Sequence, residues 1–393
     1  MRADRAKKRK RIKGFDLNEL KLNNENLKPG DFWLLAVVVA LVIFGVIMVF
    51  SASYYQSIND GSRPYSYLLI AAFFAITGFG LMMAAFLFDY HNWKKLTIPV
   101  FVVTVLLLIF VLIPIAGINE PINGAYRWIR LGPVSIMPGE IAKFVSILMV
   151  AKILGDEPKK IHSLKEGILP ILGVCVLFGG LIMKQPNMST AATMCMVVGI
   201  MMFVAGLKWR WLITVIIAAF VGGIALLFQG GGYRLERITS FMDPFEHAMN
   251  EGFQVVQSLL AMGSGGLFGA GLGKSVQKNL YLPEPQNDFI LAIIGEELGF
   301  IGIMALMGAY IFLIWRGVHI ALNAPDQYGL LLASGVVIMI SLQVVLNIAV
   351  VTSSMPPTGV ILPFISYGGN ALWIFMLSAG ILLNISRHTL EVK

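Results

Sequence analysis

The sequence has 393 residues, of which 57% are hydrophobic and 13% are charged, with a formal net charge of +8. This charged fraction is about half that of soluble domains, and a soluble fold has too little interior to bury so much apolar surface. The composition therefore excludes a soluble multidomain protein and indicates an all-α, polytopic membrane protein.

Basic residues crowd the segment before the first apolar run. Within residues 1–13, Asp4 is the single acid among many lysines and arginines. Such a run can bind nucleic acid, but beside a membrane span it is retained in the cytoplasm and attracts anionic lipid. Its position favours the second interpretation, without nucleic-acid binding. We therefore expect a basic cytoplasmic segment (1–30), a membrane domain (31–386) and a cytoplasmic tail (387–393).

About ten apolar segments approach the roughly 20 residues needed to cross the hydrocarbon core. The predicted spans are Phe32–Phe50, Tyr67–Phe88, Leu96–Ile115, Pro138–Leu154, Gly167–Met183, Met188–Leu207, Trp211–Phe228, Phe289–Trp315, Tyr328–Val351 and Ala371–Ile385. Lysine and arginine gather in alternate loops and in the tail, which places both termini on the cytoplasmic side of the membrane. The exceptional connection is an outer loop at about 229–288, between spans seven and eight, and long ordered loops usually carry function.

Two arginines and a tryptophan follow the third predicted span. Arg127 and Arg130 flank Trp128 at the predicted outer interface. Guanidinium groups match phosphate oxygens, so these residues could bind a phosphate; the alternative is an aromatic anchor with arginines that extend to the interface. Glu140 and Lys143 begin the fourth span three residues apart and can pair on one helical face. A buried structural pair and a catalytic pair both fit this spacing.

A polar turn at 184–190 is either a simple outer hairpin or a substrate contact. The large loop carries Arg234 and Arg237, then Lys274 and Lys278 in a glycine-rich stretch. Glycines let backbone N–H groups approach an anion closely, which favours a phosphate contact here. A nucleotide-binding P-loop is excluded, because the residue that should be the first glycine of that motif is a phenylalanine.

Asp288 stands where the large loop meets the eighth span. Aspartate at such a position often caps the following helix. It can also act as a general base or hold a divalent cation against a pyrophosphate. The residues alone give the cap and the base comparable weight.

Together these segments resemble the SEDS family of shape, elongation, division and sporulation proteins, over nearly the whole membrane portion. The segments that carry the resemblance are Gly124–Trp128, Gln257–Lys278, Tyr281–Glu284 and Pro363–Gly369. The opening at Phe50–Ser53 and the basic N-terminal extension favour an FtsW-like branch of the family.

The resemblance implies ten helices and a peptidoglycan glycosyltransferase that polymerises lipid II. It also implies a class B penicillin-binding protein as transpeptidase partner, with other divisome or elongasome proteins. The family's catalytic aspartate falls on Asp288, although Gln286 and Asn287 replace the histidine and threonine that usually precede it. Gly139 and Asn187 are further departures, from a serine and an aspartate.

We therefore predict that Asp288 deprotonates the acceptor hydroxyl, with Mg²⁺ or Mn²⁺ as a candidate cofactor and Asp288 as a candidate ligand, and with no nucleotide. The residues predicted to bind substrate are Arg127, Arg234, Arg237, Lys274, Lys278, Glu140 and Lys143. One alternative is a lipid II flippase, in which Glu296 and Glu297 join the Glu140–Lys143 pair along a polar route. Another is a scaffold for division proteins.

Overall fold

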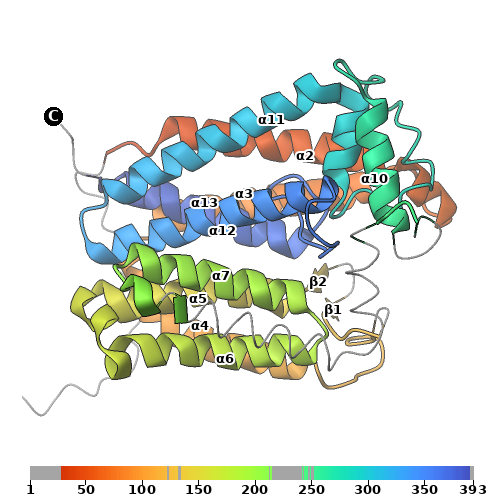
Figure 1. Cartoon of the computed structure of the whole chain (residues 1–393). Helices are drawn as coiled ribbons and strands as arrows, with labels where there is room; N and C mark the ends of the chain where they lie inside the picture. Colours follow the sequence, from red (N-terminus) through yellow and green to blue (C-terminus); the bar gives the residue numbers. More distant parts are fainter. Residues whose placement is uncertain are drawn as a thin grey trace, which may run out of the picture.

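The computed structural model describes residues 28–121, 124–131, 134–211, 213–214, 241, 243–246, 248 and 252–389. In this part of the chain, long helices run side by side in one bundle (Figure 1). They are α2 (Phe32–Asn59), α3 (Ser66–Leu87), α4 (Tyr90–Phe110), α5 (Pro138–Gly155), α6 (Leu169–Lys184), α7 (Met188–Val204), α11 (Ile290–Leu322), α12 (Gln327–Val351) and α13 (Gly369–Ser386). Seven of the described helices are long and apolar enough to cross a membrane.

The spans predicted from the sequence agree with the observed helices. Each predicted span within the described residues coincides with a helix, whereas the seventh, Trp211–Phe228, falls largely outside them. The third helix begins earlier than expected, at Tyr90, because the Asp89 side chain accepts a hydrogen bond from the amide of His91 and caps it. The prediction of an all-α polytopic membrane protein is confirmed, with the addition of one short β-hairpin.

α12 lies between two groups of helices (Figure 1). It packs against α11 and α13 on one side and against α5 and α7 on the other, while α13 packs extensively on α3. The apolar side chains of α12 are distributed over all faces of the helix, and more than half of its most apolar stretch is buried. The burial of α12 therefore comes from its packing against helices on both sides.

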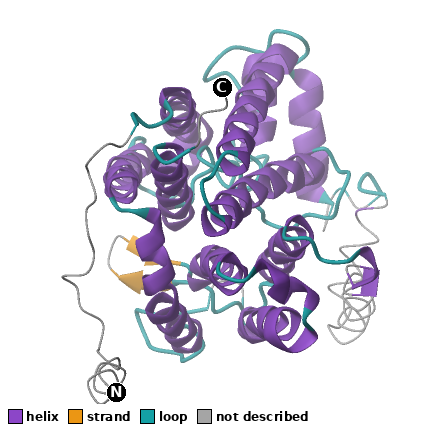
Figure 2. Cartoon of the chain, turned by 90° about the vertical axis from the view of Figure 1, so that its left-hand side faces the viewer, coloured by secondary structure: helices purple, strands orange, loops and turns teal. Residues whose placement is uncertain are grey.

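The bundle has two distinct ends. The hairpin end carries strands β1 (Ile129–Leu131) and β2 (Val134–Ile136), which pair antiparallel, and the short helix α10 (Phe253–Ser264) (Figure 1). The tail end carries the two ends of the described chain. There the amide of Lys28 donates to the carbonyl of Arg387 at 3.4 Å, and the Lys28 Nζ donates to the carbonyl of Thr389 at 3.1 Å. Figure 2 views the molecule from the tail end.

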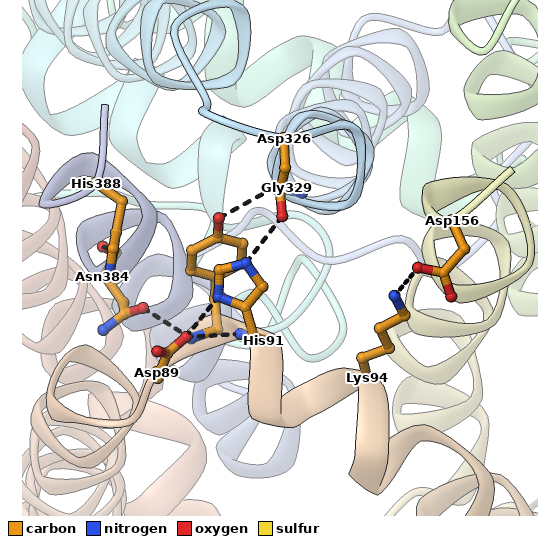
Figure 3. Close-up of polar contacts among 9 residues, drawn as sticks. Asp89, His91, Lys94, Asp156, Asp326, Gly329, Asn384 and His388 are labelled. Carbon is orange, nitrogen blue, oxygen red and sulfur yellow. Dashed lines mark hydrogen bonds and ion pairs between the residues drawn. The ribbon is translucent and has the colours of Figure 1, made fainter. Parts of the chain in front are cut away.

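A polar cluster joins three helices at the tail end (Figure 3). The imidazole of His91 lies between two carboxylates, 2.8 Å from Asp89 Oδ1 and 2.9 Å from Asp326 Oδ2. The hydrogen bond from His91 holds the pKa of Asp89 below its usual value. Asn384 Oδ1 on α13 accepts a hydrogen bond from the amide of Tyr90 at 2.9 Å. These contacts connect the start of α4, the start of α12 and the end of α13.

The glycine-rich stretch has a structural role at a break in α11. Gly299 has φ 68° and ψ −168°, which interrupts the helical path of α11. The amides of Ala270 and Gly271 donate to the carbonyls of Glu296 and Glu297 at 2.9 and 3.0 Å. These carbonyls would otherwise lack partners at the break, and an unsatisfied carbonyl in a membrane costs several kcal/mol.

The first amides of the second half of α11 also find hydrogen-bond partners in the glycine-rich stretch. The amides of Phe300 and Ile301 donate to the carbonyls of Gly266 and Leu267 at 2.9 and 3.1 Å. Such close backbone contact requires glycine: a Cβ on Gly269, whose φ is 80°, would lie 2.2 Å from the Glu297 carbonyl oxygen. The stretch that was predicted to approach a phosphate therefore directs its Ala270 and Gly271 amides at α11.

Gly269→Ala is expected to lower the free energy of unfolding by at least ~2 kcal/mol, because it combines a positive φ with a backbone clash. Thermal unfolding of the detergent-purified protein measures this. Gly263→Ala is the matched control, since Gly263 lies in α10 and a Cβ added there would meet no described atom within 4 Å. Equal unfolding temperatures for the two variants would contradict the account of the break.

Candidate functional site

A polar cavity of about 380 Å³ lies at the hairpin end. Its walls come from the segment around β1 and β2, the starts of α5 and α7, the loop before α11, the middle of α12 and the segment before α13. The residues that line it include Arg127, Trp128, Glu140, Lys143, Asn187, Glu284, Asn287, Asp288, Gln343, Thr358, Gly359, Tyr367 and Asn370. We call this the polar cavity.

Asp288 is half-buried in the wall of the polar cavity. Its carbonyl accepts a hydrogen bond from Asn347 Nδ2 at 2.7 Å, and the same Nδ2 donates to the carbonyl of Val360 at 2.8 Å. The carboxylate lies close to Gly359, where an added Cβ would be 3.7 Å from Asp288 Oδ2. α12 and the segment before α13 therefore fix the position of this carboxylate.

The alternative role of Asp288 as a helix cap is not what the structure shows. α11 begins at Ile290 and its N-cap is Phe289, so the Asp288 side chain lies outside the capping position. The loop before α11 is instead anchored by its backbone, because the amide of Tyr367 donates to the carbonyl of Gln286 at 2.8 Å. Asp288 lines the polar cavity, and its Oδ2 lies beside Gly359 in the same wall.

Glu140 and Lys143 form an ion pair on the first turns of α5. Lys143 Nζ lies 2.8 Å from Glu140 Oε2, and the Lys143 and Glu140 side chains are 5% and 10% exposed, respectively. Burying two charges is costly, so their mutual attraction must offset much of the desolvation. Both line the polar cavity, which makes the pair a structural element and a cavity wall at once.

Arg127 also lines the polar cavity. Its guanidinium donates to the carbonyls of Gln185 and Pro186 and lies 6.0 Å from the ring centre of Trp128. These contacts tie the segment before β1 to the polar turn between α6 and α7. Asn187 in that turn caps α7 and lines the cavity, so the turn is a hairpin that also forms part of the cavity wall, and its contact with substrate stays a prediction.

Lys278 occupies a different place. Its Nζ lies 2.7 Å from Glu297 Oε1 and 3.1 Å from Ser51 Oγ, and the Lys278 and Glu297 side chains are 3% and 0% exposed. Ser51 Oγ donates to the same carboxylate at 2.7 Å. The triad joins α2, α11 and the loop, and it is absent from the described lining of the polar cavity.

The other predicted substrate-binding residues are not gathered at the cavity. Lys274 is exposed on the loop and is not among the described lining residues. Arg234 and Arg237 lie outside the described residues. The structure thus brings together Asp288, Arg127, Glu140 and Lys143, and it places Lys274 and Lys278 elsewhere.

The charges around the polar cavity bear on metal binding. The described lining residues include the three carboxylates of Glu140, Glu284 and Asp288 and the two cations Arg127 and Lys143. Asp288 and Glu284 offer carboxylate oxygens at this cavity, but the described residues contain no group of three or more His, Cys, Asp or Glu side chains that could hold a metal ion, so Mg²⁺ or Mn²⁺ binding stays a prediction. Magnesium commonly uses one or two carboxylates and completes its shell with water and phosphate oxygens.

Several lining residues were not singled out from the sequence. Gln343 lies in the middle of the apolar helix α12, and Thr358 and Asn370 lie in or beside the segment before α13. Polar side chains inside spans are costly and tend to mark functional positions. That signal was present in the sequence for Gln343.

Comparison with known proteins gives the family. A family model described as a cell cycle protein of the FtsW, RodA and SpoVE type matches residues 32–391. The chain belongs to this family. It is similar to stage V sporulation protein E of Bacillus subtilis, with 40% identity over 361 residues that cover 91% of this chain and 97% of that protein. It is also 39% identical over 356 residues to a probable peptidoglycan glycosyltransferase FtsW of Geobacter sp. strain M18, which covers 91% of this chain and 96% of that protein.

Solved structures of family members share the fold. The rod shape determining protein RodA of Thermus thermophilus is 29% identical, with a TM-score of 0.67 over 92% of this chain and 98% of that one. A chain solved within a peptidoglycan synthase complex is 27% identical, with a TM-score of 0.73 over 91% of this chain and 98% of that one. Both similarities extend over nearly the whole bundle.

Lys278→Ala is expected to cost ~3–5 kcal/mol of stability, because Glu297 is left charged, buried and without its cation. Combining Lys278→Met with Glu297→Gln should recover part of that loss. Thermal unfolding in detergent measures both, and the exposed Lys274→Ala is the control that should unfold like wild type. If Lys278→Ala unfolded at the wild-type temperature, the stabilising role of Lys278 would be contradicted, and its predicted role in substrate binding would remain.

Proposed function

We propose that this protein is a peptidoglycan glycosyltransferase that polymerises lipid II at the outer face of the cytoplasmic membrane. The observation that carries the proposal is the position of Asp288, a half-buried carboxylate held by backbone contacts in a polar cavity that also contains Arg127 and Lys143. The similarity to probable peptidoglycan glycosyltransferases over about nine-tenths of the chain supports it.

The reaction transfers a growing glycan from its undecaprenyl pyrophosphate carrier to a sugar hydroxyl of an incoming lipid II. A new bond forms between that hydroxyl oxygen and the anomeric carbon of the donor, while the bond from this carbon to the pyrophosphate breaks. Asp288 accepts the hydroxyl proton, and undecaprenyl pyrophosphate leaves with the electron pair. Because the leaving group is already activated, the protein mainly positions the reactants and removes one proton.

The departing pyrophosphate needs positive charge near it. Arg127 and Lys143 line the polar cavity and would supply part of that charge. A divalent ion held by Asp288 and Glu284 would neutralise further charge on the pyrophosphate oxygens. Lys274, Arg234 and Arg237 are proposed to attract the anionic substrate from the large loop, whereas Lys278 acts through its buried pair with Glu297.

We also propose that the hairpin end faces outward and that both termini are cytoplasmic. The tail end carries Lys28, Lys94, Lys95 and Arg387, as well as the basic turn at 158–162, as expected for the cytoplasmic side. A crosslinking class B penicillin-binding protein is the proposed partner. Its support is the similarity to a chain in a peptidoglycan synthase complex that coordinates polymerization with crosslinking.

The flippase alternative requires a polar route through the bundle. Glu296 and Glu297 were its candidate residues, but their carboxylates accept hydrogen bonds from Ser275 and Ser51, respectively, and neither is among the described residues that line the polar cavity. Glu140 and Lys143 remain at the hairpin end. The polar groups of the site therefore gather at one end of the bundle, which favours an enzyme that works at one membrane face.

Asp288→Asn is expected to lower the rate of lipid II polymerisation by about 10²- to 10⁴-fold, because the amide keeps the shape of the side chain and cannot accept the proton. The assay supplies lipid II to the purified protein and its partner in detergent and resolves the glycan polymer on a gel. Asp60→Asn is the matched control, since Asp60 is exposed and accepts a hydrogen bond from Gln56 at 2.9 Å.

Thermal unfolding of the Asp288→Asn variant must match that of wild type for the result to bear on chemistry. Full polymerisation by a folded variant would rule out Asp288 as the base. If wild type made no polymer but moved lipid II across sealed vesicles, the flippase interpretation would replace the enzyme.

A further inference from the structure

Gln343 is a buried carboxamide without a described partner. The side chain is 0% exposed in the middle of α12, and neither Nε2 nor Oε1 has a hydrogen-bond partner among the described residues. A buried amide with both halves unpaired is unfavourable unless a ligand or ordered water completes it. Gln343 also lines the polar cavity, so its unpaired atoms lie at the cavity wall, and a bound ligand that displaces the side chains covering them would contact them.

The position of Gln343 relates directly to Asp288. One turn along α12 lies Asn347, whose Nδ2 binds the carbonyl of Asp288 at 2.7 Å. Residues four apart on a helix share a face and are separated by about 6 Å along its axis. Gln343 therefore lies one helical turn deeper in the bundle than Asn347, the residue that holds the backbone of Asp288.

Other unpaired groups line the same cavity. Within the described part of the chain, Asn187 Nδ2, Asn287 Oδ1 and Thr358 Oγ1 also have no hydrogen-bond partner. The wall thus offers donors and acceptors together. A phosphate provides acceptors alone and would leave the Gln343 Oε1 unpaired, whereas a ligand that both accepts and donates hydrogen bonds would pair both polar atoms of this side chain.

We propose that Gln343 binds the acetamido group of an N-acetylated sugar in the lipid-linked substrate. The Gln343 Nε2 donates to the acetamido carbonyl, and the Gln343 Oε1 accepts a hydrogen bond from the adjacent hydroxyl of the same sugar ring. A secondary amide in its trans form points its N–H away from its carbonyl, which leaves that N–H for a second acceptor such as Asn287 Oδ1. This assignment rests on the proposed function, because it takes the substrate to be an amino-sugar glycan.

The test measures direct binding of two ligands to the full-length protein in detergent, by native mass spectrometry. One ligand is lipid II, and the other is an analogue in which hydroxyl groups replace the acetamido groups. Wild type is expected to bind the analogue about ten- to a hundredfold more weakly, because its buried amide loses a partner. Gln343→Met, which keeps length and loses both polar atoms, is expected to bind the two ligands equally weakly.

Gln56→Met is the matched control, since Gln56 is paired with the exposed Asp60, and it should discriminate between the ligands like wild type. Thermal unfolding shows whether Gln343→Met has folded. If it has not, Gln343→Asn, which withdraws the carboxamide by one methylene, takes its place and is expected to lose the same discrimination.

Equal binding of both ligands by wild type would overturn the proposal, and so would full discrimination by a folded Gln343 variant. Failure of the proposed function has a different signature. If wild type discriminated between the ligands through Gln343 but formed no polymer, the proposal that Gln343 recognises the sugar would be supported. The proposal that the protein is a glycosyltransferase would be contradicted.

Discussion

Inside a membrane, every polar group must find its partner within the protein, and this constraint explains much of the structure. At the break in α11, backbone groups of the glycine-rich stretch replace the lost helical hydrogen bonds, and Gly269 permits the contact. The Lys278–Glu297 pair follows the same logic for charges. In the polar cavity, by contrast, Gln343 and Asn187 present atoms that have no partner within the described structure. The contrast separates the polar groups that are paired within the bundle from those at the cavity wall that have no described partner.

The polar cavity is assembled by elements that are distant in sequence and rigid in structure. Asp288 lies at the end of the large loop, but Asn347 on α12 holds its backbone carbonyl, and its side chain lies close to Gly359. α12 is also anchored at the tail end, where Asp326 binds His91. A helix held at both ends and packed on both sides presents its polar residues at fixed positions, which is what a site that positions reactants requires.

The sequence predicted the spans because apolar runs of that length have few alternatives. It made Asp288, Arg127 and the Glu140–Lys143 pair candidates because charge at a membrane edge is costly, and the structure brings these candidates to one cavity. The sequence did not reveal that the glycine-rich stretch supplies the hydrogen bonds missing at the break in α11. Glycines that approach a backbone and glycines that approach a phosphate look the same in composition. Lys278 was assigned to substrate for a related reason: its partner Glu297 lies on another element, in α11. Gln343 was overlooked because a single amide hardly changes the hydropathy of α12.

The central claim is that the carboxylate of Asp288 faces water on the outer side of the membrane. The direct measurement is labelling of Asp288→Cys in intact cells with a membrane-impermeant maleimide, after the free cysteines Cys175 and Cys195 have been replaced by alanine. Glu157→Cys, exposed at the tail end, reports the cytoplasmic side. The account predicts that Asp288→Cys is labelled from outside and that Glu157→Cys is labelled only after lysis. Labelling of Asp288→Cys only after lysis, or not at all, would contradict it.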